Sequence, residues 1–304
     1  MNKILSLPVI ALLTILFMSN TTTSIYDMKG NEESSKKFEF MYSGTVNPGN
    51  GLMPLVGQMS KDGKKIYFTS QNHQGKRALH VSSRNVKGAD FISNTKIEGL
   101  DNHQVLMPSV SADEKTLVFV ESKDGTQAGN DLYTASLNNN EVSNVQKLSS
   151  LNEEGVSENY PFLSADGKRL YFTKQVNADI EFYVADANAE GGFSTPKKLK
   201  VDIPKVSNNM SCVLSNDELD MYVLSGEHIY HTQRTSLNDD FNTPVKIASS
   251  HTEGYMTGIA MTNDTEELYV FNSIGFRNTQ LLRYINTKAR NAQSGSKVQF
   301  VDVE

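Results

Sequence analysis

The chain has 304 residues, of which 38% are hydrophobic and 21% charged, and its formal net charge is −6 at pH 7. A chain of this length can bury a sizeable core as one large domain or two small ones, and its composition is ordinary for a soluble globular protein. The lack of a basic excess argues against a nucleic-acid partner, because no surplus cations are available to neutralise phosphates.

The first 24 residues differ from the rest. A basic start at Lys3 precedes an almost wholly apolar run over 5–18 and a small, polar stretch over 19–24. This pattern predicts a secretory signal peptide over 1–24, because the apolar core is too short for a comfortable membrane span. An uncleaved N-terminal anchor is the alternative.

Export and localisation follow from that prediction. No cysteine follows the apolar core, so a lipid-anchored form is not expected, and no later apolar run approaches the ~20 residues of a spanning helix. We expect a periplasmic or secreted protein that does not span the membrane once the signal is cleaved, with a flexible tether over 25–37. Cys212, the only cysteine, lies in an apolar run and is expected to be a buried thiol rather than a nucleophile.

One motif recurs five times along the chain. Each copy contains an Asp, a Ser or Thr two residues before it, and an apolar or aromatic residue five residues after it. The spacings between successive copies are 51, 53, 51 and 47 residues, and the five residues are Asp62, Asp113, Asp166, Asp217 and Asp264. A period near 50 that is maintained five times indicates a repeat architecture.

Each repeat predicts four short β-strands separated by Gly, Asn, Asp and Ser turns, which is the unit of a β-propeller. We therefore expect an all-β single domain over 38–304 with five blades, six being the alternative. The segment 37–46 (KFEFMYSGTV) is expected to supply the missing fourth strand and close the ring. The segment 297–303 (KVQFVDV) could complete the fifth blade instead, or both could pair, giving an added edge strand or a partial sixth blade.

The loop SADGK at 164–168 could be read as an active site or a metal loop. Its Asp can accept backbone N–H bonds within a turn, and the following Gly tolerates a positive φ, so a hairpin turn is the simpler interpretation. Five equivalents on five repeats indicate scaffold. Where Gly is replaced, at Glu114, Glu218 and Thr265, we expect a different turn geometry.

The repeats resemble a known family. The pattern of Pro, Ser-x-Asp-Gly-Lys, Leu-Tyr-Phe and Asp-Leu-Tyr is similar to the WD40-like propeller repeat of the TolB type, and the repeats at 106–122 and 160–174 match it best. The fourth and fifth repeats are degenerate, and Gly57 stands where the second and third repeats have Pro. The resemblance covers about 38–304 and implies a scaffold and a habit of export, without a catalytic motif.

Ligands of propellers usually meet the loops where the innermost strands begin. These loops are expected at 47–52, 101–104, 153–159, 207–209 and 251–255. They are polar, so they are either ordinary solvated turns or a binding mouth for a protein partner or an envelope glycan. The candidate binding residues are His103, Glu158, Asn159, Asn209, Glu253 and Tyr255.

An enzyme is the alternative to a binding module. Glu158 and Glu253 could form the carboxylate pair of a glycoside hydrolase or lyase, which requires a defined separation that sequence cannot supply. We expect no repeat to depart from its equivalents by placing an isolated acid within a strand start. No cofactor motif and no dedicated metal site is expected, because the six histidines lie on different loops and strands, and His228 and His231 fall on opposite faces of one strand.

Overall fold

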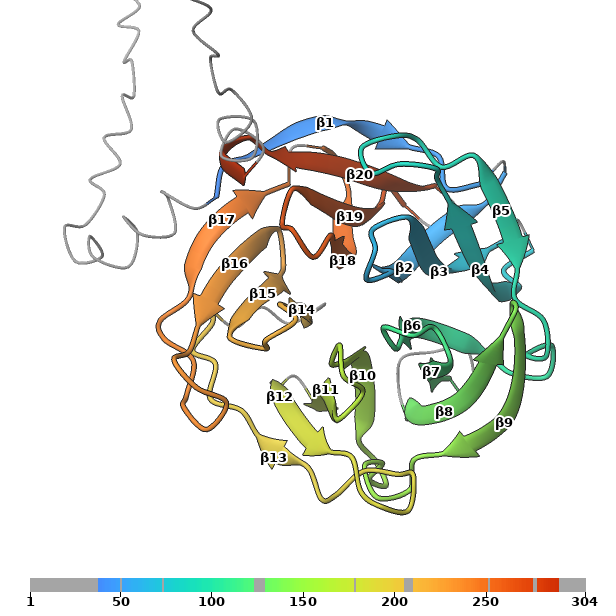
Figure 1. Ribbon diagram of the computed structural model, residues 1–304, viewed down its shortest axis with the longest axis vertical. Coiled ribbons are helices and arrows are strands. Elements are labelled where there is room, and N and C mark those ends of the chain that lie inside the picture. Colours follow the sequence, from blue (N-terminus) through green and yellow to red (C-terminus); the bar gives the residue numbers. More distant parts are fainter. Residues whose placement is uncertain are drawn as a thin grey trace, which may run out of the picture.

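The computed structural model describes residues 38–49, 51–72, 74–122, 129–177, 179–204, 210–250, 252–275 and 278–289, and these form five four-stranded antiparallel sheets arranged in a ring (Figure 1). This confirms the all-β, five-bladed propeller. In order from the axis outward, the first blade contains β2 (Met53–Met59), β3 (Lys65–Gln71), β4 (Arg77–Ser83) and β5 (Ser93–Lys96). The second contains β6 (Val105–Val110), β7 (Thr116–Glu121), β8 (Asp131–Asn138) and β9 (Glu141–Lys147).

The remaining blades repeat this order. The third contains β10 (Ser157–Leu163), β11 (Arg169–Val176), β12 (Asp179–Asp186) and β13 (Lys197–Lys198). The fourth contains β14 (Met210–Leu214), β15 (Asp220–Ser225), β16 (His228–Gln233) and β17 (Val245–Ser249). The fifth contains β18 (Tyr255–Met261), β19 (Glu267–Ser273), β20 (Thr279–Asn286) and, outermost, β1 (Phe40–Val46).

The ring is closed by the N-terminal strand, as predicted. β1 pairs antiparallel with β20, from Phe40 opposite Asn286 to Val46 opposite Leu281, and Figure 1 shows these two strands side by side. The Glu39 N–H donates to Asn286 Oδ1 at 3.1 Å, and the Thr287 N–H donates to the Glu39 carbonyl at 3.0 Å. The segment 297–303, the other candidate for closure, lies outside the described residues.

The hydrophobic core lies between neighbouring blades. Each of its five clusters joins residues of at least two sheets; the cluster between the first and second blades includes Tyr67, Leu79, Leu117 and Phe119. Strands flanked by sheets on both sides are apolar on both faces, and every residue of β6 and of β14 is buried. Blade-on-blade packing therefore buries both faces of each sheet, which a single blade could not do alone.

All five Asp turns share the same side-chain hydrogen bonds. In the third blade, Asp166 Oδ1 accepts from Ser164 Oγ at 2.8 Å and from the Lys168 N–H at 3.0 Å, and the Gly167 N–H donates to the Ser164 carbonyl at 2.9 Å. The expectation of another geometry where Gly is replaced is wrong. Glu114, Glu218 and Thr265 have φ of 57°, 60° and 59°, close to the 71° of Gly167.

Two of these left-handed residues bond to the preceding blade. The Tyr171 hydroxyl donates to Glu218 Oε2 at 2.5 Å, and the Tyr67 hydroxyl donates to Glu114 Oε2 at 2.9 Å. A left-handed conformation costs a non-glycine residue roughly 1–2 kcal/mol, and a hydrogen bond to a carboxylate is of similar size. Sequence reasoning treated the turn in isolation and so could not include this offsetting contact.

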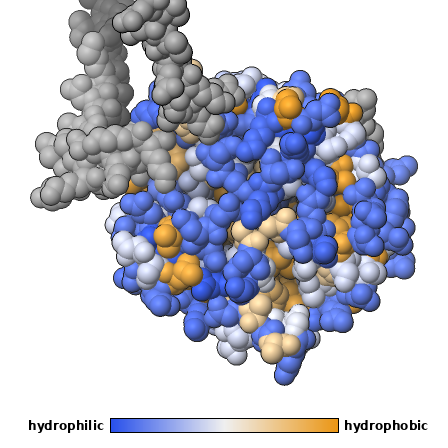
Figure 2. Space-filling view, in the orientation of Figure 1, coloured by the Kyte–Doolittle hydropathy of each residue, from blue (hydrophilic) through white to orange (hydrophobic). Residues whose placement is uncertain are grey.

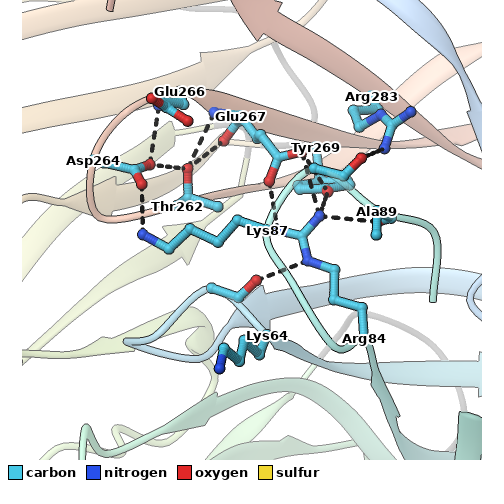
Figure 3. Close-up of polar contacts among 12 residues, drawn as sticks. Lys64, Arg84, Lys87, Ala89, Thr262, Asp264, Glu266, Glu267, Tyr269 and Arg283 are labelled. Atoms are coloured by element: carbon cyan, nitrogen blue, oxygen red, sulfur yellow. Dashed lines mark hydrogen bonds and ion pairs between the residues drawn. The ribbon is translucent and has the colours of Figure 1, made fainter. Parts of the chain in front are cut away.

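A buried ion pair joins the fifth blade to the first at the same end of the ring (Figure 3). Arg84 Nη2 lies 2.5 Å from Glu267 Oε2, and the two side chains are 0% and 2% exposed. The Arg84 guanidinium also donates to the Tyr269 hydroxyl at 2.8 Å and to the Gly63 carbonyl at 2.8 Å. Arg234 of the fourth blade repeats the bonds to a turn carbonyl and to a tyrosine. It donates to the Glu218 carbonyl at 3.0 Å and to the Tyr171 hydroxyl of the third blade at 2.8 Å.

Candidate functional site: the mouth face

The innermost strands β2, β6, β10, β14 and β18 each end at an Asp turn, so the loops before them lie at the opposite end of the ring. We call this end the mouth face and the other the turn face. The described mouth-face loops are 47–49 with 51–52, 101–104, 153–156 and 252–254. Asn209, one of the predicted binding residues, lies outside the described residues.

Glu253 and Tyr255 lie at the start of the innermost strand of the fifth blade. Both are exposed, and Tyr255 retains 53% of its accessible surface. The Glu253 carbonyl accepts a hydrogen bond from Asn272 Nδ2 at 2.9 Å, which holds this loop against β19. The loop backbone is thus anchored while an aromatic ring and a carboxylate remain available to a ligand.

His103 belongs to a hydrogen-bonded group in the second blade. His103 Nδ1 lies 3.0 Å from Glu121 Oε1, and the imidazole is in edge contact with Tyr133 at a centroid distance of 6.3 Å. Burial together with the Glu121 carboxylate raises the pKa of Tyr133. The His103 side chain is 26% exposed, so one edge of the ring can reach solvent.

Glu158 departs from its equivalents in the other blades. It is paired across the sheet with Lys174, whereas the corresponding pairs are Pro54 with Ser70, Val105 with Glu121, Met210 with Ser225, and Met256 with Asn272. All four positions equivalent to Glu158 are therefore apolar. The expectation that no repeat places an isolated acid in a strand start is wrong. Register identifies the equivalents. Four of the five positions, Glu158 included, lie eight residues before the Asp of their own turn, and Met210, in the one described innermost strand that pairs without a register shift, lies seven residues before it.

The Glu158 carboxyl group is buried and only partly compensated. The residue is 0% exposed; its Oε1 accepts from the Glu153 N–H at 3.3 Å and lies 3.6 Å from Lys174 Nζ. Burial raises the pKa of Glu158 to about 7, against the opposing effects of Lys174 and the Glu153 N–H. Lys174 makes a shorter ion pair with Glu153, at 3.0 Å, and lies over the Tyr183 ring at 5.5 Å.

Two buried oxygen atoms beside this pair have no hydrogen-bond partner among the described residues: Glu158 Oε2 and Asn130 Oδ1. The backbones of these two residues are joined, since the Glu158 N–H donates to the Asn130 carbonyl at 3.0 Å. Asn159 is also buried, and its Oδ1 accepts from Asn130 Nδ2 at 2.7 Å. A protonated Glu158 could supply a donor that an ionised one lacks.

The axis of the ring is largely filled by side chains. A cavity of about 20 Å³ lies there among apolar groups that include Met107, Tyr160, Phe162 and Ile259, which is room for about one water. Apolar residues reach the surface near the centre of an otherwise mostly hydrophilic face (Figure 2). Cys212 also lines this cavity; it is buried, as predicted, and burial raises its pKa to about 12, so the thiol is not a ready nucleophile.

Within the described ranges, no group of three or more His, Cys, Asp or Glu side chains is placed to hold a metal ion. His231 is buried and bonded to Asp220 at 2.6 Å, whereas the partly exposed His228 lies 3.1 Å from Ser249 Oγ. Their different surroundings agree with the predicted opposite faces. No helix in the described part of the chain is long and apolar enough to cross a membrane.

Comparisons with known proteins show the fold. No protein-family model and no curated protein matches the chain. Among solved structures, TolB from Acinetobacter baumannii is similar at 20% identity and a TM-score of 0.46, over 78% of this chain and 52% of the TolB chain, so the chain spans about half of that protein. A gluconolactonase from Xanthomonas campestris is similar at 9% identity and a TM-score of 0.50, over 80% and 88% of the two chains.

An oligogalacturonate lyase from Vibrio parahaemolyticus is similar at 11% identity and a TM-score of 0.41, over 82% of this chain and 96% of the lyase. These proteins share the β-propeller architecture with this chain. At such identities a common fold does not carry a common substrate, because one propeller scaffold supports many chemistries.

Proposed function

We propose that this protein is an exported binding module of the bacterial envelope that holds a protein partner on its mouth face. The observation that carries the proposal is the Glu158–Lys174 pair. It replaces an apolar residue paired with a neutral one in the first, fourth and fifth blades, and Val105 paired with Glu121 in the second. A buried ion pair is seldom the most stable solution for a core position. Both carboxylate oxygens of Glu267 are bonded by Arg84, whereas Glu158 Oε2 has no hydrogen-bond partner among the described residues. The incompletely bonded Glu158–Lys174 pair therefore supports a requirement other than stability.

The shape of the mouth face at the ring axis favours a protein partner over a small ligand. Small molecules are usually bound in cavities of about 300–1,000 Å³, whereas the cavity at the axis holds about 20 Å³. The exposed and partly exposed groups are instead distributed across blades: Tyr255 and Glu253 on the fifth, Glu153 on the third and His103 on the second. Exposed Tyr and ionic groups are suited to a broad protein contact.

Export rests on the pattern of the first 24 residues, a basic start followed by a short apolar run and a small polar stretch. The test of export is the mature N-terminus of the protein recovered from its native envelope, which we expect near residue 25. Recovery of the intact 304-residue chain from the membrane fraction would contradict it.

Site-specific photocrosslinking tests the mouth face. A photoreactive residue at Tyr255 is compared with one at Lys168, whose exposed side chain lies on the turn face. We expect one discrete protein adduct in envelope extract from position 255 and none from position 168. The double variant Glu158→Met/Lys174→Ser, which gives the third blade the pair found in the fourth, should weaken the adduct. Equal adducts from both positions would contradict a specific face.

A carbohydrate-active enzyme using Glu158 and Glu253 is the competing function. The raised pKa of Glu158, about 7, is the observation in its favour, because a general acid must be protonated near neutral pH. Against it, the Glu158 carboxyl is buried while Glu253 is exposed. Turnover of an envelope polysaccharide that is lost in Glu158→Gln, with the fold retained, would establish the enzyme and overturn the binding module.

A further inference from the structure

A second surface lies on the rim of the ring, at the outer edge of β1. β1 is the last strand of its sheet, and within the described residues no strand pairs with its outer edge. Such an edge presents a row of backbone donors and acceptors that can pair with another strand. Each of the five blades has an outermost strand of this kind, and the five are not alike.

The outer strand of the fifth blade lacks the charges that protect the others. β1 reads FMYSGTV and has no charged residue. Each of the other four outermost strands carries at least one lysine: Lys96, Lys147, Lys197 with Lys198, and Lys246. Because lysine on an edge strand discourages pairing with a further strand, β1 is the edge best suited to accept one.

Apolar side chains and a groove lie beside this edge. Met41 on β1 is 57% exposed, and Ile92 on the neighbouring first blade is 67% exposed. A groove of about 420 Å³ runs between the end of β1 and the first blade, lined by Thr45, residues 47–49 and residues 90–94. The edge thus offers backbone pairing and, next to it, space for side chains.

We propose that the C-terminal segment 297–303 (KVQFVDV) docks along the outer edge of β1 as a further strand of the closing blade. The segment is rich in residues that favour strands. As a strand it would place Val298 and Phe300 on one face with Asp302, and Val301 and Val303 on the other with Lys297 and Gln299, so each face offers apolar side chains. The described chain ends at position 289 beside the beginning of β1, where the Thr287 N–H bonds to the Glu39 carbonyl.

The length of chain between them is sufficient. The seven residues 290–296 span at most ~24 Å, and the seven residues of β1 extend over ~23 Å. The segment can therefore reach either end of β1. A second copy of the protein, pairing β1 with β1, is the other occupant that an uncharged edge could accept, and amide hydrogen exchange distinguishes the two.

Amide hydrogen exchange on the full chain tests the docking. We expect the Phe300→Asp variant to exchange about tenfold faster than the unchanged protein at β1 amides that are not bonded to β20. Amides within β20 should keep their rates, which shows that the ring itself is intact. Equal rates in the two proteins would overturn the proposal. Protection of β1 that rises with protein concentration in both would also overturn it, in favour of a second copy.

A cysteine-pair experiment gives an independent readout. Thr45→Cys combined with Gln299→Cys should form an intramolecular disulfide under oxidised glutathione, and Phe300→Asp should slow its formation. The matched control is Ser143→Cys with Gln299→Cys, which moves the first thiol to the exposed edge of β9 in the second blade. The buried Cys212 does not compete. Similar yields from the pair and the control would contradict docking on β1.

Discussion

The two ends of the propeller differ in how closely the five blades resemble one another. At the turn face, every blade has the same Asp-centred turn, and the backbone keeps its left-handed residue even where Gly is replaced by Glu or Thr. At the mouth face, the residues paired at the beginning of the innermost strand change from blade to blade, and one blade carries a buried ion pair.

This difference separates the contacts that hold the ring together from the face that we propose to bind a partner. The turn face carries the contacts that join blades, such as the Arg84–Glu267 pair and the bonds from Tyr67 and Tyr171, so substitutions there should reduce stability. The mouth face carries polar groups that the fold does not require, since other blades have Pro, Val or Met at the position of Glu158. Substitutions at Glu158 should therefore change binding without a matching loss of stability.

The largest expected effect is at the turn face. Arg84→Ala leaves the Glu267 carboxylate buried without its partner, and breaking a buried pair in this way typically costs about 3–5 kcal/mol. Urea denaturation measures the free energy of unfolding. The control is Lys87→Ala, which removes the partly exposed ion pair with Asp264 (Lys87 side chain 41% exposed) and should cost under about 1 kcal/mol. Similar losses in the two variants would contradict a stabilising role for the buried Arg84–Glu267 pair between the fifth and first blades.

The next effect is the pH dependence contributed by Glu158. Its pKa is about 7 in the folded protein against an ordinary value of 4.5, so the folded state binds the proton more tightly than the unfolded state. The associated stability is fully present below pH 4.5 and is lost as the pH rises to about 7, a change on the order of 3 kcal/mol. Burial of the group is the main cause.

Glu158→Gln measures that contribution. The variant should lack this part of the pH dependence, so the difference in unfolding free energy between it and the unchanged protein should vary from pH 4.5 to 7 and then level off. The charged groups around Glu158 are Lys174, Glu153 and Asp131, so Glu153→Gln, which alters an exposed neighbour, serves as the control. A constant difference across this pH range would show that Glu158 titrates normally.

Much of the fold was predictable, because the repeat itself carries the information. The Ser or Thr, the Asp and the following aromatic residue recur at a period near 50, and the segment 37–46 resembles a fourth strand. The polar contacts between neighbouring blades were not predictable. The bond from Tyr171 to Glu218 joins residues 47 apart in the sequence, and only the packing of two blades brings them together. The site was predicted in part. Glu158 was identified from its loop, but its burial and its pairing with Lys174 depend on the folded sheet.

A smaller effect is expected at the turn itself. Asp166→Ala removes the acceptor of two hydrogen bonds and should cost about 1–2 kcal/mol at neutral pH. Burial acts to raise the pKa of Asp166, but the bonds from the Lys168 N–H and Ser164 outweigh it, so the pKa is lowered. The contribution is therefore present above about pH 4 and lost as the pH falls further. The two proteins should converge in stability as the pH falls below the lowered pKa, and a gap that persists in acid would contradict the carboxylate's role.

The smallest effect is expected when Glu114, which has a left-handed backbone conformation, is replaced by Gly. Glu114→Gly relieves the backbone strain at φ 57° but removes the acceptor of the Tyr67 hydroxyl and the partly exposed ion pair with Lys65. We therefore expect a net change under about 0.5 kcal/mol. Glu114→Ala loses the bond and keeps the strain, so it should cost about 1 kcal/mol. Gly167→Ala is the control, because a Cβ there meets no atom within 4 Å and the cost of about 1 kcal/mol reflects φ alone. If Glu114→Gly stabilised the protein by as much as Gly167→Ala destabilises it, the bond from Tyr67 to Glu114 would contribute nothing to stability. The glutamates in these turns would then not be explained by their hydrogen bonds to the neighbouring blade.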